Sequence, residues 1–146
     1  MKISELTGLL REDIQFEDLY RLYRDEEEER NAEITPEKKV ARLLYELTLS
    51  PSYKGYKYLK EAILMLCDED ISYNSFTKNI YPLIAEKHNT TAQNIEKNIR
   101  FAIRKIYDSN TPEELEKYLG KTSIIYTNPS NVKFITYCAE KLRLER

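Results

Sequence analysis

The stretch that most constrains the fold runs from Tyr81 to Tyr107 and reads YPLIAEKHNTTAQNIEKNIRFAIRKIY. In its second half, apolar residues recur at spacings of three and four. An α-helix turns by about 100° per residue, so these residues share one face of a helix. The pattern predicts a helix over residues 91–107 that packs on a core through that face. The apolar residues are Ile95, Ile99, Ala102, Ile103 and Ile106.

The residues before this helix predict a shorter helix and a tight turn. The shorter helix is expected to open at Pro82, whose missing N–H costs nothing in a first turn. Asn89 stands where the turn needs a residue that tolerates positive φ. Thr90 and Thr91 are both candidates for the N-cap of the second helix, and Gln93 is placed to complete a capping box on Thr90. The whole stretch therefore predicts a helix-turn-helix.

The side of the second helix that faces away from the apolar residues carries long hydrogen-bond donors. Base edges in the major groove of DNA present paired acceptors that suit Arg and Lys, so a donor row on an exposed helix is chemically suited to reading bases. The same pattern is also typical of an ordinary solvated surface helix. The row and its two polar neighbours are Gln93, Lys97, Arg100, Arg104, Asn94 and Glu96.

The net charge of −2 conceals a polarity along the chain. Residues 1–34 carry five Lys/Arg against eleven Asp/Glu, a formal charge of −6. Residues 74–107 carry six Lys/Arg against two Glu, a formal charge of +4. A basic patch on an acidic protein favours nucleic acid as a partner, because only the contact face must neutralise phosphates.

Residues 1–34 are expected to form a short acidic helical arm, and residues 35–146 a separate domain. Apolar positions from Leu6 to Tyr23 supply one helix face, and the acidic run DEEEER at 25–30 follows them. Such a segment is short of core on its own. The arm is open to four readings: it docks on the body, pairs with a second copy, remains loose, or covers the basic face in the absence of DNA.

The domain is predicted to be all-α, with six helices. Thr35, followed by Pro36, is expected to begin a helix that stops at Pro51. A helix near residues 58–68 follows, with Lys54, Lys57 and Lys60 as further phosphate contacts. After the helix-turn-helix, a short helix from Thr111 to Gly120, an extended piece at 122–127 and a last helix opening at Asn128-Pro129 are expected. The predicted inward residues of the last helix are Val132, Ile135, Cys138, Ala139 and Leu142.

Enzymes, metal proteins and membrane proteins have little support in the composition. The three glycines form no phosphate loop, and no metal-ligand spacing is present, so no catalytic residue, metal or cofactor is expected. His88 is predicted to be a hydrogen-bonding or phosphate-facing turn residue. Cys67 and Cys138 lie in apolar helical stretches and are expected to be buried reduced thiols. The absence of a signal peptide and of a long apolar run favours a cytoplasmic protein.

Four separated segments carry a resemblance to a known family. They are KGYKYLKEAI at 54–63, FTKNIYPLIAEKHNTTAQNIEKNIRFAI at 76–103, NPSNVKF at 128–134 and AEKLRLE at 139–145. From about Thr35 onward the chain resembles the C-terminal DNA-binding effector domain of the stage-zero sporulation response regulator, the sporulation initiation transcription factor A family.

The resemblance implies a six-helix domain that binds TGTCGAA-like DNA sites, often as two protomers in tandem, and regulates promoters through RNA polymerase. The family's base-reading positions fall on Glu96, Lys97 and Arg100. Flanking or backbone contacts are expected from Lys87, Thr90, Thr91, Gln93, Asn94 and Arg104. The expected partners are double-stranded DNA, the sigma subunit of RNA polymerase and a second copy of the chain.

Two departures from the family bear on this expectation. Lys97 and Asn94 stand where the family usually has arginine, and lysine makes a point contact where guanidinium makes a fork. Asn98 also replaces a small apolar residue.

Residues 1–34 show no alternation of strand and helix, so no phosphorylatable receiver is expected there. Two functions stay open: a sequence-specific transcriptional regulator, and an antagonist that pairs with a full-length sporulation regulator or with RNA polymerase.

Overall fold

The computed structural model describes residues 15–32, 34–68 and 76–145. Within these ranges it contains seven α-helices and no strand, so the all-α prediction is confirmed. Six of the helices lie in residues 36–145, as expected for the domain. The helices are α2 (Phe16–Ala32), α3 (Pro36–Glu46), α4 (Lys54–Cys67), α5 (Tyr81–Lys87), α6 (Ala92–Ser109), α7 (Pro112–Leu119) and α8 (Asn131–Leu144).

The chain divides into two units, residues 1–35 and residues 36–146. The first contains α2, whose predicted helical character is present from Phe16 onward. The predicted apolar positions from Leu6 to Ile14 lie outside the described residues. The second unit contains α3 to α8 and holds the core.

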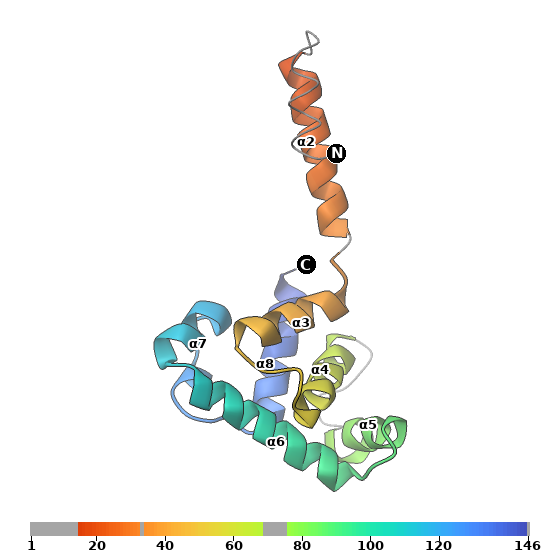
Figure 1. Cartoon of the computed structure of the whole chain (residues 1–146), viewed down its shortest axis with the longest axis vertical. Helices are drawn as coiled ribbons and strands as arrows, with labels where there is room; N and C mark the ends of the chain where they lie inside the picture. The colour runs from red at the N-terminus through yellow and green to blue at the C-terminus, as the bar shows by residue number, and fades with distance from the viewer. Residues whose placement is uncertain (1–14, 33, 69–75, 146) are drawn as a thin grey trace. The chain divides into compact units, whose positions relative to one another are not determined.

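Helix α4 is the centre of the second unit, because it packs against both α6 and α8. Helix α3 covers α4, and α5 packs on the N-terminal part of α6, as Figure 1 shows. In α4 the apolar residues Leu59, Ala62, Ile63 and Leu66 are completely buried, and the predicted α6 stripe is buried as well. The largest buried side chains are Phe134, Leu44, Leu47, Leu59, Ile63, Leu66, Ile80, Ile84, Ile95, Ile99, Ile103 and Ile106.

Several helix ends agree with their predicted caps. Thr111 caps α7 by accepting a hydrogen bond from the Glu114 N–H, and Pro112 occupies the first turn. Gly120 follows α7 with a φ of 85°, a conformation that glycine adopts at little cost. Cys67 and Cys138 are buried and form no disulfide, as predicted.

Other boundaries differ from the prediction. Helix α4 begins at Lys54 rather than near Tyr58, and its first turn includes a buried glycine. The piece at 122–127 is not extended, because Ser123–Ile125 form a 3₁₀ turn, η3. The prediction that Val132 points inward was wrong, since Val132 is 42% exposed. The other four predicted inward residues of α8 are buried, as expected: Ile135, Cys138, Ala139 and Leu142. Ser130 is the N-cap of α8, and Asn131 and Phe134 complete the buried face in place of Val132.

Helix α5 is preceded by a further helical turn that the sequence did not indicate. The π-helical turn η2 (Phe76–Ile80) runs directly into α5 at Tyr81, and Pro82 lies in the first turn, close to the predicted start. In the part of the chain that the structure describes, no helix is long and apolar enough to cross a membrane.

Candidate nucleic-acid interface

The turn between α5 and α6 has the geometry that the sequence indicated. Asn89 adopts a φ of 53°, which confirms the predicted positive-φ position. The Thr90 N–H donates to the Ala85 carbonyl at 2.9 Å and closes the end of α5. Thr91 is the N-cap of α6, because its hydroxyl accepts from the Asn94 N–H at 3.1 Å. The capping box predicted between Thr90 and Gln93 is therefore replaced by a cap from Thr91.

Asn94 belongs to a side-chain network within the turn. Its Nδ2 donates to the Thr90 hydroxyl at 2.9 Å. Its backbone and side-chain oxygens both accept from Asn98 Nδ2, at 2.8 and 3.0 Å. Asn98 thus braces Asn94, and the two side chains stiffen the first turn of α6.

The predicted donor row lies on the exposed side of α6. Gln93, Lys97, Arg100 and Arg104 are exposed, whereas the apolar stripe on the opposite side of the helix is buried. Arg100 Nη2 donates to Glu96 Oε1 at 2.9 Å, an ion pair between residues one turn apart. Two of the three residues proposed to read bases therefore hold each other in place on the helix surface.

The buried face of α6 packs so closely against α4 at Gly55 that no side chain fits between the two helices. A Cβ added at Gly55 of α4 would lie 2.1 Å from the Asn98 carbonyl oxygen and 2.9 Å from Ala102 Cβ. Real Cβ atoms do not approach backbone so closely, so α4 and α6 are in contact through their backbones. This contact fixes the depth at which α6 sits in the domain.

A second link joins the N-terminal part of α6 to the start of α8. Asn131 is only 8% exposed, and its Nδ2 donates to the Glu96 carbonyl at 3.0 Å. Burial raises the pKa of the Tyr81 hydroxyl, and a side-chain hydrogen bond with Asn131 acts in the opposite direction. Asn131 thereby connects α5, α6 and α8 directly behind the exposed pair of Glu96 and Arg100.

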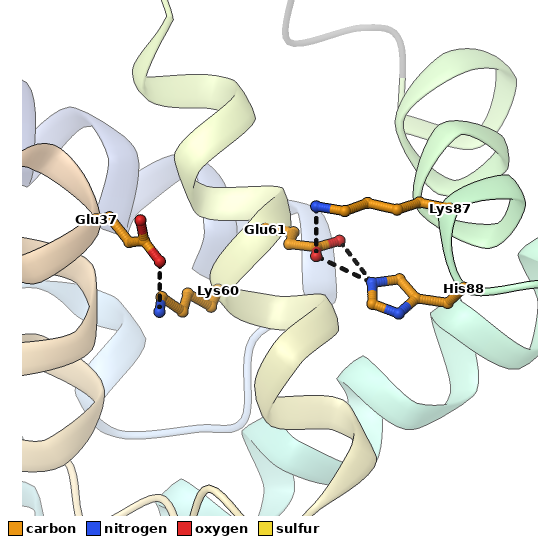
Figure 2. Close-up of polar contacts among 5 residues, drawn as sticks. All are labelled: Glu37, Lys60, Glu61, Lys87 and His88. Atoms are coloured by element: carbon orange, nitrogen blue, oxygen red, sulfur yellow. Dashed lines mark hydrogen bonds and ion pairs between the residues drawn. The ribbon is translucent and has the colours of Figure 1, made fainter.

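Figure 2 shows how Glu61 of α4 holds the turn. His88 Nε2 lies 2.9 Å and 3.0 Å from the two carboxylate oxygens of Glu61, and Lys87 Nζ lies 3.1 Å from Oε1. The His88 ring also packs edge-on against Tyr58, with 5.1 Å between ring centroids. His88 is therefore a hydrogen-bonding turn residue, as predicted. Lys87 keeps two thirds of its side chain exposed despite its contact with Glu61.

A polar cleft of about 460 Å³ opens beside the turn. Lys54 and Lys57 of α4 and residues of the turn contribute to its lining. Lys60, which was grouped with these two lysines, instead contacts Glu37 of α3 at 3.2 Å (Figure 2). The cleft is lined by Pro51, Ser52, Tyr53, Lys54, Lys57, Tyr58, His88, Asn89, Thr90 and Asn94.

The sequence alone did not single out three residues that position this surface. Glu61, Gly55 and Asn131 each lie outside the helix-turn-helix and each contact it. Gly55 precedes the predicted start of its helix and resembles a loop signal, so its close packing was not readable from the sequence. Asn131 and Glu61 carried no signal of their contacts either, because their partners are distant in sequence. Among the described residues, no group of three His, Cys, Asp or Glu side chains is placed to hold a metal ion.

The chain matches a known protein family over most of its length. Residues 40–142 match the family model described as sporulation initiation factor Spo0A C terminal. The matched span contains α4 to α7 completely, together with most of α3 and α8. It therefore includes the helix-turn-helix and every residue found to hold it, and it confirms the resemblance noted in the sequence. Because this span is more than half of the chain, the protein belongs to the Spo0A C-terminal family of sporulation-related DNA-binding effector domains.

Proposed function

We propose that this protein is a sequence-specific transcriptional regulator that binds TGTCGAA-like sites by placing α6 in the major groove. The observation that carries the proposal is the division of α6 into a buried face and an exposed row of donors. The helix is long enough, at 18 residues, to present its N-terminal half to a groove while its other face stays packed.

Glu96, Lys97 and Arg100 are proposed to touch base edges. Arg can bind guanine O6 and N7 with two hydrogen bonds, and Glu can accept from cytosine N4. Arg100 and Glu96 are already paired in the protein, so each is oriented before DNA arrives. Neighbouring guanine and cytosine in the site would be read by this pair together, while Lys97 supplies a single point contact.

Backbone and flanking contacts are proposed for the start and the edge of the helix. The N-terminus of α6, which Thr91 caps, is an end of the helix at which a phosphate is favoured. Gln93 and Arg104 extend the exposed row at its two ends. The remaining proposed contacts, all in or beside the turn, are Lys87, Thr90 and Asn94.

The proposed domain organisation, location and partners are those that the family resemblance implies. Residues 35–146 form the DNA-binding domain and residues 1–34 an acidic extension. Two copies bind tandem sites in the cytoplasm, and contact with the sigma subunit of RNA polymerase changes promoter activity. The alternative function is an antagonist that pairs with a full-length sporulation regulator or with polymerase, for which the exposed donors would be unnecessary.

An electrophoretic shift assay with the full chain tests the proposal. A duplex containing TGTCGAA is compared with a scrambled duplex of equal length, at two or more salt concentrations. Arg100→Ala should weaken cognate binding by about 1–3 kcal/mol and leave scrambled binding nearly unchanged. Lys87→Ala should weaken both duplexes alike and reduce the salt dependence, because phosphate contacts carry no sequence information.

The matched control is Lys121→Ala, which removes an exposed positive charge outside α6 and outside the turn. Equal binding of the two duplexes, together with no effect of Arg100→Ala, would contradict specific base reading. Absence of any DNA binding, with retention of a purified sporulation regulator on the immobilised chain, would favour the antagonist.

A further inference from the structure

Helix α2 exposes large aromatic side chains in a regular row. Phe16 is 78% exposed, Tyr20 59% and Tyr23 51%. With about 100° between successive residues, these three and Leu19 lie on one face of the helix. A helix of 17 residues gains stability in water when such a face is covered.

One edge of this row carries opposite charges at its two ends. Glu17 lies beside the start of the row and Arg24 beside its end, and the helical spacing puts both on the same side of it. Two helices that run antiparallel place this side of one copy against the same side of the other. Glu17 of each copy then faces Arg24 of its partner.

We propose that α2 pairs with α2 of a second copy as an antiparallel two-helix interface centred between Tyr20 and Arg21. The pairing itself does not depend on the proposed DNA-binding function. Its proposed role, which is to join two DNA-binding domains, rests on that function. The register that matches Glu17 with Arg24 also interleaves the apolar row. Phe16 of one copy then lies next to Tyr23 of the other, and the two Tyr20 side chains meet at the centre.

The acidic end of the helix excludes the parallel arrangement. The sequence has five consecutive acidic residues at 25–29, near the C-terminal end of α2. A parallel pair would place these two runs side by side and add like-charge repulsion. In the antiparallel pair they lie at opposite ends. Charge therefore selects the same arrangement that the aromatic row fills.

The small size of the interface indicates a weak dimer. Four apolar side chains per copy cover less than the roughly 800 Å² per partner of a standard stable interface. Two adjacent DNA sites would raise the effective concentration of one copy for the other and strengthen the pairing. The expected role is cooperative binding to tandem sites.

Cysteine crosslinking of the full chain tests the orientation. In the proposed register two Tyr20 positions face each other, whereas two Phe16 positions are about 13 Å apart along the axis. Tyr20→Cys should therefore form a disulfide dimer under mild oxidation, and Phe16→Cys should not. The native cysteines are buried, so the unmodified chain is the control. Crosslinking of both variants would overturn the antiparallel register, and crosslinking of neither would overturn the pairing.

Charge reversal tests the edge contacts without adding a thiol. Sedimentation equilibrium of Glu17→Arg and of Arg24→Glu should each show self-association weakened about tenfold, since two symmetric ion pairs are reversed. The double variant should regain the wild-type value. Failure of the double variant to recover would contradict the register, and a wild-type chain that stays monomeric at every concentration would contradict the pairing.

DNA binding separates this inference from the function on which it rests. The charge variants should bind a duplex with a single site as the wild type does, and lose cooperativity on a duplex with two sites. Crosslinking without any DNA binding would contradict the proposed function and leave the helix pairing standing. Equal cooperativity in the wild type and in both single variants would assign tandem binding to another surface and overturn this role for α2.

Discussion

The two faces of α6 are built under different constraints. The inner face is fixed by buried isoleucines, by the backbone contact at Gly55 and by the hydrogen bond from Asn131. The outer face holds exposed donors, of which Arg100 is paired with a neighbour on the same helix. The position of the helix therefore depends on the inner face. Substitutions at the inner face should cost folding free energy, and those at the outer face should change binding.

The largest effect is expected where α4 touches α6. Gly55→Ala would place a Cβ 2.1 Å from the Asn98 carbonyl oxygen, so the two helices must separate. We expect a loss of about 3 kcal/mol or more in the free energy of unfolding, measured by urea denaturation. Gly120→Ala is the control, because its added Cβ meets only Tyr137 Oη at 3.6 Å and the cost comes from a positive φ, about 1 kcal/mol. Equal losses in the two variants would contradict this account.

Asn131 tests the hydrogen bond behind the pair of Glu96 and Arg100. Asn131→Ala removes the buried donor to the Glu96 carbonyl and should cost about 2 kcal/mol in unfolding free energy. Asn128→Ala, which changes an exposed residue of the same type, should stay within about 0.5 kcal/mol. A neutral result for Asn131→Ala would show that α6 is positioned by apolar packing alone.

The buried thiol of Cys138 in α8 makes the stability of the core sensitive to alkaline pH. Burial raises the pKa of this thiol above its ordinary value of 9.0. The folded state therefore holds a proton that the unfolded state releases above about pH 9, and stability is lost as pH rises. The decline reaches up to about 1.4 kcal/mol per pH unit for one group. In thermal melts between pH 8 and 10, the melting temperature of Cys138→Ala should fall less steeply with pH than that of the wild type. The variant should nevertheless be less stable than the wild type at neutral pH.

Thr91 tests the point where the two faces meet. Thr91→Ala removes the acceptor for the Asn94 N–H and should lower stability by about 1 kcal/mol. Thr90→Ala should cost less, since Thr90 accepts only from the Asn94 side chain. Urea denaturation of both variants measures the two losses in unfolding free energy. A larger loss for Thr90→Ala than for Thr91→Ala would contradict the assignment of Thr91 as the N-cap.

The smallest effect on stability is expected on the outer face. Glu96→Gln breaks an exposed ion pair with Arg100, and such pairs contribute less than about 0.5 kcal/mol. Unfolding should be nearly unchanged, whereas affinity for TGTCGAA-containing DNA should change if Glu96 orients Arg100 or reads a base. A loss of stability comparable to that of Asn131→Ala would remove the distinction between the two faces.

Sequence periodicity predicted much of the fold, because most helices carry an apolar stripe with clear ends. The buried face of α6, the positive φ of Asn89, the cap at Thr111 and the glycine at 120 were all readable locally. These features depend on residues within a few positions of one another. The all-α class follows from the sum of such local signals.

The errors arose where long-range packing decides the structure. Val132 has the spacing of an inward residue, but the cap at Ser130 and the contacts of Asn131 and Phe134 turn α8 so that Val132 faces outward. The start of α4 was placed too late, because its glycine resembles a loop signal until α6 is seen against it. The proposed base-reading residues stay a prediction, since exposure on α6 is necessary for base contact and does not demonstrate it.

The contact between Gly55 and the Asn98 carbonyl has a consequence for protein engineering. A helix seated on another helix through main-chain atoms keeps its place when its outward side chains are exchanged. New combinations at positions 93, 96, 97, 100 and 104 can therefore be screened in a library without repacking the interior. The same backbone contact makes position 55 intolerant of variation. Random mutagenesis of this domain should therefore recover glycine there almost without exception.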